Sequence, residues 1–224
     1  TSREIADRAG LNERYVREWL GSMVTGGIVE YDERNKTYRL PEEHAAKLCR
    51  SSNTNMAGSM QWVAVLGHVE DEVLDAFSHG KGVPYSAYHR FHEVMAEESA
   101  QTVVAALDDH IVPLVPGLVE RLASGVDVLD IGCGSGRAIN WLAAKYPNSR
   151  FAGYDFSEEG VAAARAEAQS RGLKNVRFEA RDVAAINEPA AFDLITAFDA
   201  IHDQAKPDEV LANSRERPAM DLAG

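Results

Sequence analysis

The stretch that decides the fold is VDVLDIGCGSGRAINWLAAKYPNSRFAGYDFS, residues 126–157. It opens with an apolar run that ends at Ile131, continues through three alternating glycines and an amphipathic run, and closes on a second apolar stretch that ends at Asp155. This pattern predicts a buried strand, a tight turn, a helix and another strand. Glycines at such a turn let a ligand lie against the backbone at the carboxyl end of the strand. The three are Gly132, Gly134 and Gly136.

The spacing of these residues indicates a nucleoside-containing ligand. Asp155 lies nineteen residues after Gly136, at a strand end where a carboxylate can accept hydrogen bonds from both ribose hydroxyls. The helix that begins near Arg137 adds unpaired N–H groups and the positive end of a dipole, which favour a carboxylate or a phosphate. The dinucleotide fingerprint G-x-G-x-x-G would require glycine where Arg137 stands, and the lysine of a P-loop is missing from this sequence. The ligand is therefore expected to belong to another nucleoside class.

The whole region 126–224 alternates strands with helices and is expected to form one domain. This order predicts an α/β fold with a mostly parallel sheet that is covered on both faces. The predicted strands are 126–132, 150–156, 176–182 and 193–201, and the predicted helices are 137–145 and 158–171. After the fourth strand, the remaining sequence fits one helix and no strand.

The first region, residues 1–50, predicts a helix-turn-helix with a wing. Thr1 or Ser2 can cap a helix that ends at Gly10, and Asn12 can cap a second helix that ends at a Gly-Gly pair. GIVEYD and KTYRL, joined by the turn-forming DERN, predict a hairpin. A DNA-binding transcriptional regulator is an alternative function for such a domain. It is the weaker one, because this region holds nine basic and nine acidic residues and lacks a basic face.

The middle region, residues 51–125, is expected to be a helical linker that also caps a substrate site. MQWVAVLGHVEDEVLDAF predicts one amphipathic helix, GKGVPYSAY a loop, and FHEVMAEESAQTVVAALDDHIVPLV a helix up to Pro113. Its aromatic and histidine side chains either wall an acceptor pocket or pack in the core, which is the commoner role of an aromatic stripe. The substrate candidates are Trp62, Tyr85, Tyr88, His89, His92 and Met95. No carboxylate and histidine set completes a metal site around His89 and His92, so no metal is expected.

Composition limits the partners of the chain. The formal net charge of −12 over 224 residues disfavours binding to nucleic-acid phosphate backbones and to anionic membranes. We therefore expect no nucleic-acid partner and no membrane partner, and no apolar run approaches the roughly 18 residues of a membrane span. Cys49 and Cys133 are too few for a disulfide framework, so the cytoplasm is the expected compartment.

Four motifs in sequence order resemble the class I S-adenosylmethionine-dependent methyltransferases. DIGCGSG, with an acid two places before its first glycine, resembles their first motif. GYDFS resembles the ribose-binding acid motif, ARDV the adenine motif, and FDLITAFDAIHD the fourth strand with its loop. The resemblance implies a Rossmann-like, doubly wound sheet, S-adenosyl-L-methionine as cofactor, S-adenosyl-L-homocysteine as product, and no metal. The cofactor-binding residues that it implies are Asp130, Gly132, Cys133, Gly134, Gly136, Asp155, Phe156, Asp182, Val183, Phe198 and Asp199.

A winged helix ahead of such a domain is similar to the small-molecule O-methyltransferases and related bacterial enzymes. That resemblance implies a homodimer and a small-molecule acceptor, methylated at a hydroxyl or else at nitrogen or carbon. In that family a histidine and aspartate pair after the fourth strand supplies the general base, and IHDQAKPDEV aligns His202 and Asp203 with it. The sequence departs from the family motif at two points. Gln204 replaces a tryptophan, and the spacing from the histidine and aspartate pair to PDE is one residue longer.

The expected sheet is incomplete, which leaves a second function open. The family's sheet has seven strands, four are evident here, and NSRERPAMDLAG resembles nothing in the family. A chain truncated at its C-terminus would serve as a catalytically inactive interaction or dimerisation module. Each site residue also has a purely structural alternative. The glycines could form a plain strand-to-helix turn, Cys133 could pack in the core, and Asp155 could cap a helix, for which Ser157 is the better candidate. Asp182 could be a solvated acid in a turn, Asp199 could end the strand, and His202 could be an ordinary loop histidine.

Overall fold

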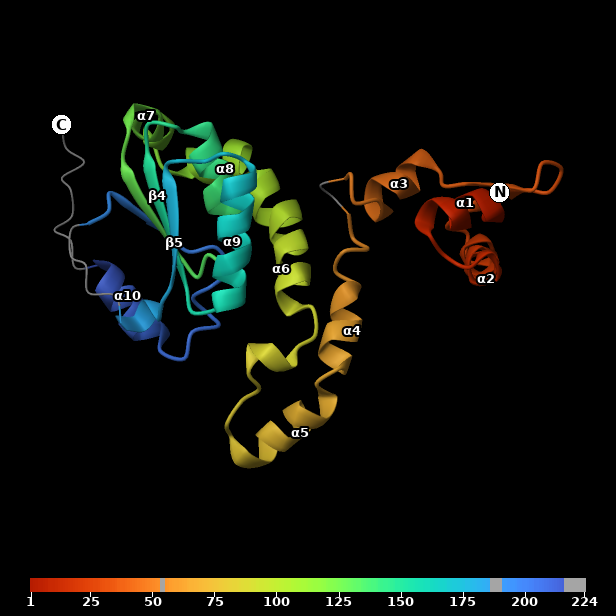
Figure 1. Cartoon of the computed structure of the whole chain (residues 1–224), viewed down its shortest axis with the longest axis horizontal. Helices are drawn as coiled ribbons and strands as arrows, with labels where there is room; N and C mark the ends of the chain where they lie inside the picture. Colours follow the sequence, from red (N-terminus) through yellow and green to blue (C-terminus); the bar gives the residue numbers. More distant parts are fainter. Residues whose placement is uncertain (53–54, 186–190, 216–224) are drawn as a thin grey trace. The chain divides into compact units, whose positions relative to one another are not determined.

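The computed structural model describes residues 1–52, 55–185 and 191–215 (Figure 1). The chain divides into two compact units, Thr1–Gln61 and Trp62–Gly224, each of which is described by itself. Residues 216–224, which make up most of the tail that resembles nothing in the family, lie outside the described residues. Within the described ranges, no helix combines the length and the apolar character needed to cross a membrane.

The first unit has the helix-turn-helix and the hairpin that the sequence predicts. It contains α1 (Ser2–Ala9), α2 (Glu13–Thr25), β1 (Glu30–Asp32), β2 (Thr37–Arg39) and α3 (Glu42–Leu48), with β1 and β2 antiparallel. Thr1 forms a capping box with Glu4, and the Asn12 side chain accepts a hydrogen bond from the N–H of Arg14 at 3.0 Å. The core of the unit is Ala6, Val16 and Leu20. The sequence analysis did not predict α3.

The second unit begins with a helical region. Its elements are α4 (Gln61–Gly67), α5 (Glu70–His79), η1 (Tyr85–Ala87), α6 (Phe91–Ser99), η2 (Ala100–Val104), η3 (Leu107–Ile111), η4 (Val112–Leu114) and α7 (Leu118–Ser124). The prediction of one helix over residues 60–77 is wrong, because α4 ends at Gly67 and α5 begins at Glu70. Val69 leaves the helical conformation and is buried there. Glycine is a weak helix former, and the three acids 70–72 suit the positive end of a new helix.

The region from residue 126 forms the parallel sheet that the sequence predicts. Its elements are β3 (Asp127–Ile131), α8 (Arg137–Lys145), β4 (Arg150–Asp155), α9 (Glu158–Ser170), β5 (Val176–Ala180), η5 (Val183–Ala185), β6 (Leu194–Thr196) and α10 (Pro207–Arg215). The strand order is β5-β4-β3-β6, and all neighbouring strands are parallel. This is the Rossmann-like order, in which the chain fills one half of the sheet from β3 to β5 and then returns to the other side of β3 with β6. Ligands bind at the carboxyl ends of the strands at this reversal.

Side chains of the strands alternate between two cores. Val128 and Phe151 pack with α7, α8 and α9 on one face, whereas their neighbours Leu129 and Ala152 pack with η5 and α10 on the other. Figure 1 shows α8 and α9 beside each other against the sheet and α10 on the far side of the strands. The sheet is therefore doubly wound, as predicted.

The fourth strand is shorter than the predicted 193–201. β6 ends at Thr196, and Asp199 adopts a left-handed conformation with a φ of 55°. The loop that follows passes close to the glycine turn: a Cβ added at Gly132 would lie 2.4 Å from the Cβ of Ala200. The chain leaves the sheet early because this loop bends over the end of β3.

Candidate active site

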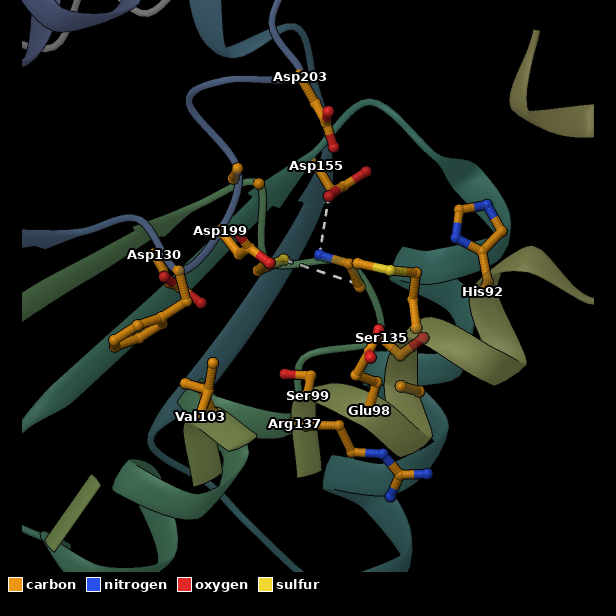
Figure 2. Close-up of a pocket in the computed structure, with 18 of the residues that line it drawn as sticks. His92, Glu98, Ser99, Val103, Asp130, Ser135, Arg137, Asp155, Asp199 and Asp203 are labelled. Carbon is orange, nitrogen blue, oxygen red and sulfur yellow. Dashed lines mark hydrogen bonds between the residues drawn. The ribbon is translucent and has the colours of Figure 1, made fainter. Parts of the chain in front are cut away.

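One cavity lies at the carboxyl edge of the sheet, entirely within the second unit (Figure 2). Four segments enclose it: η1 with α6, the glycine turn after β3, the end of β4, and the loop after β6. Of the predicted site residues, those that line it are Tyr85, His92, Met95, Asp130, Gly132, Cys133, Gly134, Asp155, Phe156, Phe198, Asp199 and Asp203. The predicted residues that do not line it are Trp62, Tyr88, His89, Gly136, Asp182, Val183 and His202.

Asp155 is held rigidly at the end of β4. Its Oδ2 accepts a hydrogen bond from the N–H of Gly134 at 2.8 Å, and its Oδ1 accepts one from the N–H of Ser157 at 2.8 Å. Ser157 in turn caps α9 by accepting from the N–H of Gly160 at 3.1 Å. Each carboxylate oxygen has a second acceptor position, so Asp155 can still receive two hydroxyl donors from a ligand.

Asp130 is the most deeply buried acid of the cavity. The side chain is 2% exposed, and its Oδ1 accepts a hydrogen bond from the Thr196 hydroxyl at 2.8 Å. Burial raises the pKa of Asp130 to about 7; the Thr196 hydrogen bond opposes this rise, and the negative charge of Asp155 adds to it. A cation placed beside this carboxylate would favour its ionised form.

The glycine turn has the conformation that its residues permit. Gly132, Gly134 and Gly136 all have positive φ, which is accessible to glycine without strain. Burial raises the pKa of the Cys133 thiol, with smaller contributions from Asp130 and Asp155, so Cys133 stays a neutral thiol. That state fits a packing role against β4 and no nucleophilic role.

The loop after β6 presents Asp199 and Asp203 to the cavity and turns His202 outward. The His202 side chain is 65% exposed. Its Nε2 lies 3.4 Å from Oδ1 of Asp203, and its Nδ1 lies 3.7 Å from Oδ1 of Asp199. The predicted histidine and aspartate pair is therefore in contact, but only its carboxylate borders the cavity.

Residues of η1 and α6 form the opposite wall. The Tyr85 ring lies 4.6 Å from Phe91 and 5.5 Å from Phe156, between ring centroids. Burial raises the pKa of Tyr85, and the negative charges of the nearby Asp203 and Asp155 raise it further. His92 Nε2 lies 3.0 Å from the Ser157 hydroxyl oxygen, so this wall is joined to the residues that follow β4.

The remaining substrate and cofactor candidates lie elsewhere. The Tyr88 ring packs on Phe91 at 5.7 Å, and the His89 ring lies 5.9 Å from His68. Asp182 accepts a hydrogen bond from the N–H of Ala184 at 2.9 Å, and Val183 is buried in the core. Among the described residues, no group of three metal-binding side chains is assembled.

Sequence reasoning missed several residues that line the cavity. They are Ala96, Glu98, Ser99, Thr102, Val103, Ser135, Arg137, Ala138, Ala200 and Gln204; Phe91, one of the aromatic side chains considered for the pocket wall, lines it as well. Those on α6 and η2 recur every three or four positions together with His92 and Met95, which is the spacing of one helix face. That periodicity was the available signal. Trp62 does not line the cavity, but its Nε1 donates to Oε2 of Glu98 at 2.8 Å.

Two family descriptions match the chain. Residues 1–50 match an Rv2258c-like winged HTH domain, and residues 122–217 match a methyltransferase domain. The first fifty residues are thus similar to a winged helix-turn-helix domain, and residues 122–217 are similar to a methyltransferase domain.

Relatives and solved structures agree with this assignment. The chain is 35% identical over 104 residues to trans-aconitate 2-methyltransferase of Methylobacterium nodulans, and the matched segment is 46% of this chain and 38% of the relative. It is 25% identical over 198 residues, 80% of this chain and 52% of the relative, to a Papaver bracteatum protein named Probable (S)-tetrahydroprotoberberine N-methyltransferase 2. The structure of mitomycin 7-O-methyltransferase MmcR shares the fold, with a TM-score of 0.65, 15% identity, and coverage of 97% of this chain and 67% of that one. The chain spans about half or less of the length of these two curated relatives.

Proposed function

We propose that this chain binds S-adenosyl-L-methionine and transfers its methyl group to a small-molecule acceptor. The observation that carries the proposal is the geometry of Asp155. Its carboxylate is fixed by the N–H groups of Gly134 and Ser157 at the carboxyl end of β4, beside the glycine turn. An acid fixed at this edge of a parallel sheet is suited to the two hydroxyls of a ribose.

Named residues fit the other parts of the cofactor. The glycine turn offers close backbone approach, and Asp130 and Asp199 border the cavity where a cationic group would be stabilised. We assign Asp182 and Val183 to the adenine by the motif resemblance alone. When bound, the cofactor supplies a methyl group already activated by its sulfonium. The chain positions the acceptor, excludes water and removes a proton.

We assign proton removal to His202 and Asp203, with His202 as the base. The contact between Nε2 of His202 and Asp203 supports the pairing, since a carboxylate stabilises and orients an imidazolium. Asp203 borders the cavity, so the pair connects an acceptor there to the exposed imidazole. His202→Ala should lower the methylation rate and leave cofactor affinity nearly unchanged, whereas an equal loss of affinity would make His202 structural.

Calorimetric titration with S-adenosylhomocysteine tests the proposal. We expect micromolar binding that Asp155→Ala abolishes, and no competition by NADH. Asp155→Asn is the matched variant, because its amide oxygen can still accept one backbone hydrogen bond while its charge is gone. If the folded wild-type chain does not bind S-adenosylhomocysteine, or binds NADH equally well, the proposal is wrong.

We further propose a cytoplasmic homodimer that forms through the first unit. Tyr15 and Trp19 are exposed and lie four residues apart, so they share one face of α2, and Leu11, just before the helix cap, is exposed as well. Equal numbers of acidic and basic residues in this region support a protein partner over DNA. Both cysteines are free, which suits a reducing compartment. Light scattering of the wild type and of Trp19→Glu tests the dimer: a monomeric wild type would contradict it.

A further inference from the structure

His92 is the predicted site histidine that lines the cavity. It is the second residue of α6 and is half-buried. Its ring packs edge-on against Phe91 at 5.5 Å and lies 6.4 Å from Tyr85, between ring centroids. Figure 2 shows the imidazole projecting from α6 beside the segment that follows β4. The two neighbouring rings restrict the orientation of this imidazole.

The polar partner of His92 is Ser157, which also holds the carboxylate that we propose for the ribose. Nε2 of His92 lies 3.0 Å from Oγ of Ser157. The same oxygen accepts a hydrogen bond from the N–H of Gly160 at 3.1 Å, at the first turn of α9. The backbone N–H of Ser157 donates to Oδ1 of Asp155 at 2.8 Å. Ser157 therefore connects the α6 wall of the cavity to Asp155.

The hydrogen bonds around the Ser157 hydroxyl favour one tautomer of His92. A serine hydroxyl has one proton to donate and two positions at which it can accept. The oxygen accepts from Gly160, and within the described part of the chain Nε2 of His92 is the one acceptor that its proton meets. Nε2 is then unprotonated, and Nδ1 carries the proton of the neutral ring. In this tautomer neither ring nitrogen can take a proton from a ligand, which agrees with the assignment of proton removal to His202.

We propose that His92 is a positioning residue, which acts through Ser157 to hold Asp155 in the orientation that the ribose of the cofactor requires. This inference rests on the proposed function. The hydrogen bond to Nε2 fixes the Ser157 hydroxyl at the start of α9, and the Ser157 N–H fixes Asp155. A carboxylate that is oriented before binding loses less entropy when it meets two hydroxyls. Loss of the His92 hydrogen bond should therefore weaken cofactor binding, although His92 lies on the opposite wall.

Three variants separate this hydrogen bond from packing. His92→Phe keeps a ring at this position but has no acceptor for the Ser157 hydroxyl. His92→Gln loses the ring but carries an amide oxygen that can accept the same proton. His89 lies three residues before His92, its ring is 5.9 Å from that of His68, and it does not border the cavity. His89→Phe is therefore the control for the loss of a histidine near the start of α6.

A double-mutant cycle in the affinity for S-adenosylhomocysteine, measured by calorimetric titration of the full chain, tests the coupling. His92→Phe should weaken binding about fivefold, the ratio that corresponds to one net hydrogen bond. Ser157→Ala should weaken binding at least as much, and adding His92→Phe to it should cause little further loss. His92→Gln should keep most of the affinity and His89→Phe all of it. Additive losses in the cycle, or an equal loss in His89→Phe, would overturn the proposal.

Nitrogen-15 NMR of the histidine-labelled chain measures the tautomer of His92 without any cofactor. In mildly alkaline buffer we expect an unprotonated Nε2 and a protonated Nδ1, at the signals that disappear in His92→Gln. Ser157→Ala should shift these signals toward the other tautomer, whereas His89→Phe should leave them in place. A protonated Nε2 in the wild type would overturn the inference. If the folded chain shows this tautomer but does not bind S-adenosylhomocysteine, the proposed function is refuted while the contact between His92 and Ser157 stands.

Discussion

Replacing the buried acid Asp130 should change how the free energy of unfolding depends on pH. Burial raises the folded-state pKa of Asp130 from 3.8 to about 7, despite the opposing hydrogen bond from Thr196. Between these two pH values the folded chain holds a proton that the unfolded chain has lost. The free energy of unfolding therefore falls as pH rises through this window, and the stabilising contribution is fully present only below about pH 4.

The magnitude follows from the two pKa values. Over the range from pH 5.5 to pH 8, a folded pKa of about 7 removes about 2 kcal/mol of the wild-type free energy of unfolding. Asp130→Asn cannot titrate and keeps an oxygen that can accept the Thr196 hydrogen bond, so it lacks this contribution. The free energy of unfolding of the variant, minus that of the wild type, should therefore rise by about 2 kcal/mol across the range.

Urea unfolding of both chains at several pH values, followed by circular dichroism, measures this difference. The two chains differ at residue 130 alone, so contributions that they share cancel in the subtraction. Asp208→Asn is the control, because Asp208 is exposed on α10, and its difference from the wild type should not reproduce the rise, so a constant difference is expected. If the difference for Asp130→Asn is also constant, the carboxylate of Asp130 is ionised throughout and the reasoning from its burial is wrong.

Two packing predictions are checked by thermal unfolding. Gly132→Ala should cost more than about 2 kcal/mol, because its φ is 68° and an added Cβ would lie 2.4 Å from that of Ala200. Gly172→Ala has the same φ and open space around it, so it should cost only about 1 kcal/mol; equal losses would contradict the collision. Ser157→Ala should cost about 1 kcal/mol through loss of the α9 cap, and Ser157→Asp should retain most of the stability.

The strand and helix order of the α/β region was predictable because local and global signals agree there. The bounds of α8 match the predicted 137–145, since glycines precede the helix and the apolar spacing sets its buried face. Asp155 could be singled out for a similar reason: the carboxyl end of a buried strand beside a glycine turn is set by topology. The caps at Thr1, Asn12 and Ser157 follow from side-chain chemistry within three residues.

Features that depend on contacts distant in sequence were not predictable. The end of β6 at Thr196 depends on how its loop passes the glycine turn, and the burial of Val69 depends on the tertiary fold. η2 is a π turn that follows directly on α6, and such turns carry no strong sequence signal. Glu98 lay in a plainly amphipathic run. Its hydrogen bond from Trp62, thirty-six residues earlier, depends on the tertiary fold and has no signal in the local sequence.

The hydroxyl of Tyr85 should control how fast the cofactor product leaves. Tyr85→Phe keeps the ring contacts with Phe91 and Phe156 but removes the hydroxyl that lies near Asp203. On the same wall His92 of α6 contacts the Ser157 hydroxyl, and the Tyr85 hydroxyl is a further polar group there that faces a carboxylate of the loop after β6. We therefore expect S-adenosylhomocysteine to dissociate several-fold faster, by about the fivefold that the loss of a polar contact of about 1 kcal/mol allows.

Stopped-flow displacement measures that dissociation rate, and Tyr88→Phe is its matched control. Tyr88 lies three residues from Tyr85 and packs on the same Phe91 ring, but it does not border the cavity. Equal rates in the two variants would mean that η1 and α6 are held by apolar packing alone. An acceleration only in Tyr85→Phe would mean that the Tyr85 hydroxyl, which faces Asp203 of the loop after β6, helps to retain the product.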